Sequence, residues 1–360
     1  MVTLALGCSD DVAIVPSDAG VAADGAPTDG GPPPADVGAD AIVPPDAATS
    51  LPKGWLYTQG NKVYVANGSG GGAVWVGRGV NMDDIFFCGY DNTLWMPNPG
   101  QSLLPLATNL VATWKPTFVR VSLGMDSYPV KPSWTSNPAQ YKTPMTAVID
   151  SMGKAGVYVL VSLRSDVSMV MEDLASGDPE ATGVPSNATD ATYVALVDTF
   201  ANASYVLFGL SNEPGGDTVQ TPVIVAAMDH AVGVIRAEEN KLGVPHHIVS
   251  VQGNNWTSNI SAYAAKPLAY DNVVYEVHGY PPKTAEYTFA NIPVIVGEYG
   301  TLANATAFYA DLEQKQIPNL AWDFEPYSGC NPDLLVVDQS STNLTPTAWG
   351  TTVKAYLLAH

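Results

Sequence analysis

Residues 205–214 read Tyr-Val-Leu-Phe-Gly-Leu-Ser-Asn-Glu-Pro, an apolar run that ends abruptly in polar and turn-forming residues. A strand with one solvated face alternates apolar and polar residues, whereas a continuous apolar run is typical of a strand buried on both faces of a parallel sheet. The polar residues then follow the carboxyl end of the strand, where enzymes built on parallel barrels carry their working groups. This stretch therefore predicts both a class of fold and the place of a site.

Seven further runs have the same character and alternate with helical patterns. The eight expected strands are Val74–Asn81, Thr117–Leu123, Val157–Leu163, Tyr205–Leu210, His247–Gln252, Val273–His278, Pro293–Glu298 and Asn319–Phe324. The expected helices are Thr108–Trp114, Met145–Ala155, Tyr193–Asn202, Val223–Leu242, Thr306–Lys315 and Thr347–Leu358. Eight such units over about 280 residues match a (β/α)₈ TIM barrel of the α/β class better than an open sheet. No GxGxxG or Walker motif occurs, which counts against a nucleotide-binding fold.

The chain changes character at residue 51. Residues 9–50 contain 30 Ala, Pro, Gly or Asp among 42 positions, so they cannot bury enough apolar surface to fold and are predicted to be a disordered linker. After this linker, Trp55–Gln59 and Lys62–Ala66 alternate apolar and polar residues around Gly60 and Asn61, which predicts a β-hairpin. Residues 51–360 are therefore predicted to form one catalytic barrel domain that begins with a hairpin.

Residues 1–8 read Met-Val-Thr-Leu-Ala-Leu-Gly-Cys and resemble the end of a bacterial lipoprotein signal. The resemblance implies that residues 1–8 are the remnant of such a signal and that Cys8 is the lipidated residue. We then expect a secreted or outer-surface lipoprotein of a bacterium, tethered to a membrane through Cys8. A basic start is lacking and the apolar run is short for a signal core, so the alternative is a frayed terminus with a stray thiol, and a true start upstream of Met1 stays open.

Charge and cysteine content exclude several classes of partner. The formal net charge is −20, which would repel phosphate backbones and makes nucleic acid an improbable partner, whereas a neutral polysaccharide is compatible with it. The three cysteines, Cys8, Cys88 and Cys330, form no CxxC pair, and the five histidines lack HExxH spacing. We therefore expect no metal and no cofactor.

Polar and aromatic side chains stand at several predicted strand ends, where a packed barrel interior would reject them. They are Asn81, Arg120, Asn212-Glu213-Pro214, Asn255-Trp256, His278-Gly279-Tyr280, Gly297-Glu298 and Trp322. The ordered set of Asn-Glu-Pro after the fourth strand, His-x-Tyr after the sixth, Gly-Glu after the seventh and Trp after the eighth closely resembles glycoside hydrolase family 5. This is the cellulase and mannanase family of clan A, and the resemblance covers the chain from about Trp55 to its end.

The resemblance implies that Glu213 is the acid/base and Glu298 the nucleophile of a retaining mechanism. Cleavage of an acetal needs a proton for the leaving oxygen and a negative charge beside the oxocarbenium-like carbon, which two carboxyls can supply. In a retaining enzyme these carboxyls lie roughly 5–5.5 Å apart. We expect Arg120 and Tyr280 to lower the pKa of Glu298, and burial together with the charge of Glu298 to raise the pKa of Glu213. Alone, either glutamate could instead be a structural or solvated carboxylate.

The resemblance also implies a set of substrate-binding residues. Asn212 would hydrogen-bond the sugar 2-hydroxyl, and His278 would lie beside the acid/base. Trp322 would form the floor of the subsite in which the bond breaks, and Trp256 would stack on a neighbouring sugar. The alternatives are a packing role for His278 and core positions for the two tryptophans.

Two further strand ends complete the predicted site. Asn81 follows the first strand and is assigned to substrate support. Arg164 ends the third strand, where many members of the family have a histidine that contacts the sugar. This difference concerns sugar selectivity more than the catalytic pair, and a guanidinium there could contact an acidic substituent.

The first and eighth strands of a closed barrel are neighbours. Cys88 follows the first predicted strand and Cys330 follows the eighth, so both thiols would lie on the same rim. We predict a Cys88–Cys330 disulfide, which an exported protein could form; two unpaired buried thiols are the alternative.

These features together predict a monomeric endo-acting β-glycanase, cellulase-like first and mannanase-like second. An exo-acting β-1,3-glucanase of the same family and a transglycosylase remain open as other enzymes. A catalytically silent glycan-binding lipoprotein is the rival from another class. The presence of both glutamates argues against that rival, because binding a sugar needs aromatic side chains but no matched acid and nucleophile.

Overall fold

The computed structural model describes residues 51–84, 99–124, 134–135, 138–163, 170–172, 179–181, 183–215, 219–282, 284–326, 332–336, 342 and 344–360. The predicted signal remnant and linker, residues 1–50, lie outside these residues, and so does lipidation at Cys8. Arg164 and the predicted Cys88–Cys330 disulfide also lie outside them. These assignments stay predictions.

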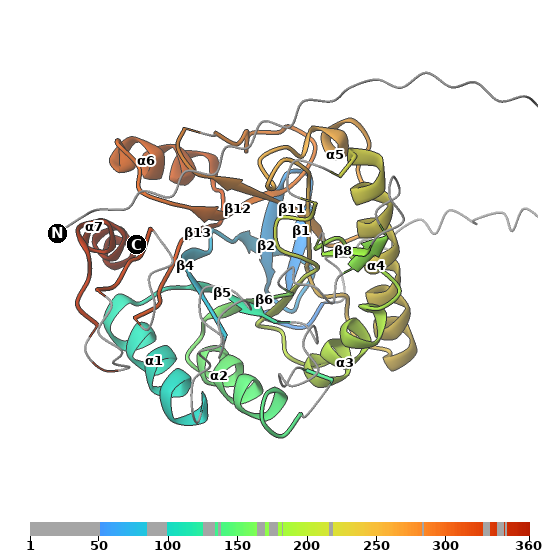
Figure 1. Ribbon diagram of the computed structural model, residues 1–360, viewed down its shortest axis with the longest axis horizontal. Helices are drawn as coiled ribbons and strands as arrows, with labels where there is room; N and C mark the ends of the chain where they lie inside the picture. Colours follow the sequence, from blue (N-terminus) through green and yellow to red (C-terminus); the bar gives the residue numbers. More distant parts are fainter. Residues whose placement is uncertain are drawn as a thin grey trace, which may run out of the picture. The chain divides into compact units, whose positions relative to one another are not determined.

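Eight parallel strands close into a barrel in the order β10-β11-β12-β13-β4-β5-β6-β9 (Figure 1). They are β4 (Arg78–Met82), β5 (Phe118–Leu123), β6 (Tyr158–Leu163), β9 (Val206–Gly209), β10 (Val249–Gln252), β11 (Val273–Gly279), β12 (Val294–Tyr299) and β13 (Asn319–Ala321). Each coincides with one of the eight predicted apolar runs, so the predicted (β/α)₈ barrel is confirmed.

Helices surround the barrel on its outside (Figure 1). They are α1 (Pro99–Trp114), α2 (Lys142–Lys154), α3 (Asp190–Phe200), α4 (Thr221–Leu242), α5 (Ser261–Ala265), α6 (Ala305–Lys315) and α7 (Ala348–Ala359). The largest apolar cluster includes buried residues of both the strands and these helices, which accounts for strands without a polar face. Among the described residues, no helix has the length and apolarity needed to cross a membrane.

A small antiparallel sheet precedes the barrel. The predicted hairpin is confirmed as β1 (Leu56–Gln59) and β2 (Lys62–Ala66), and a third strand, β3 (Gly72–Val74), pairs with β2. The predicted first barrel strand was therefore too long at its start, because Val74 pairs with Tyr64 of β2 and the barrel strand begins only at Arg78. The predicted eighth strand was too long at its end, which lies at Ala321.

A second apolar cluster includes one residue from, or next to, seven of the barrel strands. Its strand members are Phe118, Leu160, Leu207, Ile248, Val274, Ile295 and Leu320, and they pack with Leu56, Val63 and Trp75 of the N-terminal segment. Phe118 is the first residue of β5 and Ile248 immediately precedes β10, so this layer lies toward the amino ends of the strands. This apolar layer closes the barrel interior at its amino end, so the polar side chains of the interior lie nearer the carboxyl ends.

A further antiparallel pair lies in the loop between β6 and α3. It consists of β7 (Val170–Glu172) and β8 (Pro179–Ala181), and the sequence did not predict it. Each strand has only three residues, which is too short for any apolar periodicity to be recognised.

Candidate active site

Glu213 and Glu298 face each other at the carboxyl end of the barrel. Glu213 follows β9 at the end of the segment Leu210-Ser-Asn-Glu, and Glu298 is the fifth residue of β12. One oxygen of each carboxyl and one ring nitrogen of His278 all lie within 4.8 Å of one another. This separation is shorter than the roughly 6.5–9.5 Å that an inverting enzyme needs to place water between its carboxyls. Glu298 is buried, with 4 % of its surface exposed, whereas Glu213 is partly exposed. Solvent therefore reaches the pair mainly at Glu213.

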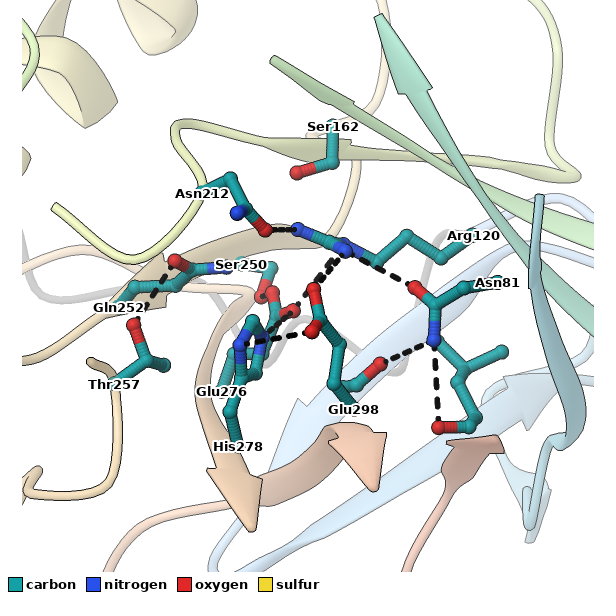
Figure 2. A network of polar contacts seen from close by, with 12 residues as sticks. Asn81, Arg120, Ser162, Asn212, Ser250, Gln252, Thr257, Glu276, His278 and Glu298 are labelled. Atoms are coloured by element: carbon teal, nitrogen blue, oxygen red, sulfur yellow. Dashed lines mark hydrogen bonds and ion pairs between the residues drawn. The ribbon is translucent and has the colours of Figure 1, made fainter. Parts of the chain in front are cut away.

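The guanidinium of Arg120 connects three polar side chains beneath this pair. It is fully buried and donates one hydrogen bond of 2.7 Å to Glu298 Oε1 and one of 3.0 Å to Asn81 Oδ1. Its other amino group donates to Asn212 Oδ1 over 2.6 Å. Figure 2 shows the guanidinium between Asn212 and Asn81, next to the carboxylate of Glu298. Arg120 thus orients the predicted nucleophile and the asparagine predicted to bind the 2-hydroxyl.

Asn81 connects Arg120 to the backbone of two neighbouring strands. Its amide nitrogen donates to the backbone carbonyls of Gly297, Leu320 and Ala321 over 2.9–3.4 Å. Both ends of the amide are therefore engaged, one by Arg120 and the other by backbone of β12 and β13. Asn81 thus positions Arg120, and a role in supporting the substrate stays a prediction.

Tyr280 and His278 contact the carboxyls from β11 and the loop after it. The hydroxyl of Tyr280 donates to Glu298 Oε2 over 2.8 Å, as the sequence predicted. Burial, followed by the charge of Glu298, raises the pKa of Tyr280 well above its usual value, so the hydroxyl stays a neutral donor. His278 Nδ1 lies 2.9 Å from Glu213 Oε1 and 3.5 Å from Glu298 Oε2. The predicted position of His278 beside Glu213 agrees with these distances.

Glu276 is a buried acidic residue of the site that the sequence analysis missed. It lies two residues before His278 in β11, so both side chains point to the same face of the strand. Its Oε1 is 3.0 Å from His278 Nε2 and 3.3 Å from Arg120 Nε, and its Oε2 accepts a hydrogen bond of 2.7 Å from Ser250. The signal was available, since Glu276 is a charged residue inside an otherwise apolar strand.

Gln252, at the end of β10, is a second missed residue. Its Oε1 accepts hydrogen bonds from the backbone N–H of Glu213 over 2.7 Å and from the hydroxyl of Thr257 over 3.1 Å. Glu213 adopts a left-handed backbone conformation with φ of 48°, which a residue with a side chain rarely takes without support. Gln252 supplies this support and fixes the direction of the Glu213 side chain.

The pKa of Glu298 differs from the expectation. Burial raises it above its ordinary value, and the charge of Glu213 adds to this effect. His278, Arg120 and the hydrogen bond from Tyr280 act in the opposite direction, as expected for the last two, but they do not outweigh burial. Arg120 and Tyr280 thus lower this pKa as predicted, but the net shift is upward because the buried carboxylate loses more hydration than its partners replace.

His278 is held as a cation. Burial lowers its pKa, but the charge of Glu298 and the hydrogen bonds to Glu213 and Glu276 outweigh burial and raise the pKa to about 10. An imidazolium has a proton on both nitrogens and therefore no lone pair for a metal. Glu213, His278 and Glu298 are close enough to share a metal ion, but the cationic ring makes them a poor ligand set near neutral pH.

The two predicted sugar-binding tryptophans differ in exposure. Trp256 follows β10 in a loop where Asn255, Trp256 and Thr257 all have positive φ, and 47 % of its surface is exposed. Trp322 follows β13, is partly exposed and accepts a hydrogen bond from the indole of Trp349 on its backbone oxygen. The exposure of Trp256 excludes the alternative that it belongs to the core.

Comparisons with known proteins concern the family and the fold of the chain. The Cellulase family (glycosyl hydrolase family 5) matches residues 89–328. The chain is 24% identical over 274 residues to endoglucanase MaCel5A of Microbulbifer sp. (strain ALW1). The aligned residues make up 69% of this chain. It spans 47% of the length of that enzyme.

Solved structures show the same fold at low sequence identity. The crystal structure of beta-glucanase SdGluc5_26A from Saccharophagus degradans has a TM-score of 0.63 and 18% identity, covering 88% of this chain and 96% of the other. The catalytic domain of a mannanase from Streptomyces sp. SirexAA-E has a TM-score of 0.58 and 21% identity, covering 83% and 89%. The family match extends over more than half of the chain, and this protein therefore belongs to glycosyl hydrolase family 5.

Proposed function

We propose that this protein hydrolyses β-linked polysaccharide with retention of configuration, as an endo-acting, cellulase-like enzyme. The observation that carries the proposal is the approach of Glu213 and Glu298 to within 4.8 Å, from strands far apart in the sequence. A retaining mechanism needs a carboxyl pair this close, because one carboxylate attacks the carbon whose leaving oxygen the other protonates.

In the first step Glu298 attacks the anomeric carbon and Glu213 gives its proton to the leaving oxygen. The C–O bond to the leaving sugar breaks, its electron pair takes up the proton, and a glycosyl ester forms on Glu298. Arg120 and Tyr280 hold the two oxygens of Glu298 and so aim the carboxylate. The Asn212 amide, oriented by Arg120, is placed to donate to a sugar hydroxyl.

In the second step water displaces Glu298 from the sugar. Glu213, now a carboxylate, takes a proton from the water, and the hydroxide equivalent attacks the anomeric carbon. Glu213 is the more exposed of the pair, with 19 % of its side chain accessible against 5 % for Glu298. Water can therefore reach Glu213 while Glu298 is still covered by the sugar.

Glucan is the preferred substrate class. The related proteins include an endoglucanase and a β-glucanase by name, and also a mannanase, which makes mannan the second candidate. The partly exposed Trp322 and exposed Trp256 offer flat apolar faces to sugar rings, which both polymers present.

The decisive experiment compares wild type, Glu213→Ala, Glu298→Gln and Glu286→Gln for release of reducing sugar. The substrates are carboxymethylcellulose, glucomannan, xylan and laminarin. Glu286 is an exposed glutamate of the same charge and size, so its variant is the matched control. We expect activity of the wild type and the control on carboxymethylcellulose, and loss of activity in the other two.

An aryl glycoside with a good leaving group separates the two glutamates. Because such a substrate needs little proton donation, Glu213→Ala should still form the glycosyl-enzyme, and azide should restore turnover. Glu298→Gln should show no such rescue. Full activity in either variant would overturn the assignment, and an inactive wild type would favour the non-catalytic glycan-binding protein.

We also propose export of the enzyme as a monomeric lipoprotein with Cys8 as its lipidated residue. The support is the Leu-Ala-Leu-Gly-Cys sequence and the Pro-rich segment that follows it. Metabolic labelling with palmitate in a bacterial host should label the wild type but not Cys8→Ser. Equal labelling of both would contradict the proposal.

A further inference from the structure

Glu276 lies below the proposed catalytic pair and contacts neither the solvent nor the opening of the barrel. Its side chain is fully buried, and its three polar partners are His278, Arg120 and Ser250. The backbone of the next strand leaves room for it only because residue 297 is glycine. A Cβ at Gly297 would lie 2.0 Å from Glu276 Oε1, so the Gly-Glu pair of β12 accommodates this carboxylate as well as the nucleophile.

We propose that Glu276 is a positioning residue that keeps His278 an imidazolium. This fixed cation stabilises the negative charge on Glu298 before the glycosyl ester forms and on Glu213 afterwards. The inference depends on the proposed function and deepens it. It assigns a role to a residue that does not touch the substrate.

Geometry determines how the ring of His278 is oriented. Nε2 lies 3.0 Å from Glu276, a carboxylate that can only accept, so Nε2 carries a proton. Nδ1 then points at Glu213 and Glu298, at 2.9 and 3.5 Å. One nitrogen thus faces a fixed anion and the other faces the two reacting carboxyls.

The cluster contains two anions at rest, so it needs His278 as a second cation beside Arg120. The charged and titratable groups around His278 are Glu276 on its own strand, Arg120 on β5, Glu298 on β12, Tyr280 after β11 and Glu213 after β9. At rest, the anions of Glu276 and Glu298 balance the cations of Arg120 and His278, and Glu213 holds the transferable proton. In the glycosyl-enzyme, Glu298 is a neutral ester and Glu213 is the anion. The cluster has the same net charge in both states.

The pKa values agree with a permanent ion pair. Burial raises the pKa of Glu276, but Arg120 and His278 outweigh burial and lower it to about 2. The pKa of His278 is raised to about 10. Neither group would change its charge between pH 4 and pH 8, so only Glu213 and Glu298 exchange charge in the reaction.

The test is Glu276→Gln, which keeps the shape and an acceptor oxygen for His278 but removes the charge. Glu239→Gln is the matched control, because Glu239 is also buried between an arginine and a histidine but lies outside the site. Two quantities are measured for each protein: the titration of the His278 ring by NMR with ¹³C-labelled histidine, and kcat on carboxymethylcellulose as a function of pH.

In Glu276→Gln we expect the His278 midpoint to fall by more than one pH unit. The ratio of wild-type to variant kcat should rise at least tenfold with pH, and its midpoint should coincide with the new midpoint of His278. Glu239→Gln should leave both quantities unchanged, and Glu276→Asp, which keeps the charge, should recover most of the wild-type behaviour.

An unchanged His278 midpoint, or a loss of kcat that is the same at every pH, would overturn the inference while leaving the proposed function intact. An inactive wild type would instead overturn the proposed function, and with it this role of Glu276. If Glu276→Gln does not fold, the titration of His278 in the wild type still tests the inference, because a midpoint near 6.5 would contradict it.

Discussion

Two buried clusters of the molecule contain the same three residue types, and only one of them is a candidate for catalysis. Arg120 and Glu276 lie inside β5 and β11, and together with His278 near the end of β11 they form a cluster beside Glu298. Arg236 and Glu239 come from the second half of α4, and His247 precedes β10, so this second cluster lies by the amino ends of the strands. The two differ in what surrounds them.

The second cluster is closed. Glu239 accepts hydrogen bonds from Arg236 over 2.5 Å and from both the ring and the backbone of His247 over 2.8 Å. Arg236 donates its remaining hydrogen bonds to backbone carbonyls before β10 and β11, and the ring of Trp55 covers His247 with ring centroids 4.6 Å apart. Asp271 lies 3.7 Å from Arg236 Nε and also contacts His246, but among the described residues Glu239 is the carboxylate that contacts the ring of His247. This cluster ties α4 to the barrel.

The first cluster has one carboxyl more than its cations balance, and that carboxyl is open to solvent. Glu213 and Glu298 add two acidic groups to Arg120, His278 and Glu276, so one proton must be held among them. The comparison teaches that such a cluster becomes a candidate for catalysis when two further carboxyls, one of them accessible, lie against its buried histidine. Residue type alone does not separate the two clusters.

The largest expected effect is that of Glu298→Gln on activity. We expect kcat on carboxymethylcellulose to fall on the order of 10⁴-fold or more, because no other side chain can form the ester. Stability should change little, because burial already raises the pKa of this carboxylate and its charge adds little to the folded state. Thermal unfolding by circular dichroism alongside kinetics would check both. A Glu298→Gln variant that loses much stability but keeps activity would show that the first cluster has a structural role, like the second.

Glu239→Gln should show the opposite pattern. Removing one partner of a buried ion pair costs about 3 kcal/mol of unfolding free energy, and the folded fraction should keep wild-type kcat. Urea unfolding and kinetics on the same preparation give both numbers. A drop in kcat with unchanged stability would contradict the assignment of this cluster to the scaffold.

The same variant has a predictable dependence on pH. Although burial raises the pKa of Glu239, the hydrogen bond from His247 and the charge of Arg236 outweigh it and lower the pKa below the ordinary value. A carboxyl with a lowered pKa stabilises the fold above its unfolded pKa, and this contribution is lost as pH falls through the folded value. The stability difference between wild type and Glu239→Gln should therefore shrink on acidification below about pH 4. A stability difference between the two proteins that grows in acid would contradict the lowered pKa of Glu239.

The smallest expected effect is that of Trp256→Ala. This side chain is 47 % exposed, so its removal should not change the unfolding midpoint, but it should remove a stacking surface for sugar. We expect KM for long oligosaccharides to rise about tenfold, which corresponds to about 1.4 kcal/mol, with kcat nearly unchanged. Oligosaccharides of increasing length supply the measurement. Equal KM values for the two proteins at every length would exclude Trp256 from the binding surface.

The sequence predicted the barrel because its strands are buried on both faces and therefore appear as uninterrupted apolar runs. The sequence predicted the strand bounds poorly where the apolar pattern continues past the residues that pair in the barrel. Val74 continues an apolar run, but it pairs with Tyr64 of β2 and lies outside the barrel. The pair Glu213 and Glu298 and its contacts with Arg120 and Tyr280 were predicted from the resemblance of the residues at strand ends to glycoside hydrolase family 5. Glu276, inside β11, and Gln252, at the end of β10, were missed because their partners lie on other strands and become neighbours only in the closed barrel.

The central claim is that Glu298 is the nucleophile of a double displacement. The most direct test is to trap the intermediate with a 2-deoxy-2-fluoro-β-cellobiosyl fluoride and to locate the label by peptide mass spectrometry. The account predicts one sugar attached to Glu298, and no attachment in Glu298→Gln. A label on Glu213 or Glu276, or turnover that yields an inverted product without any trapped ester, would contradict it.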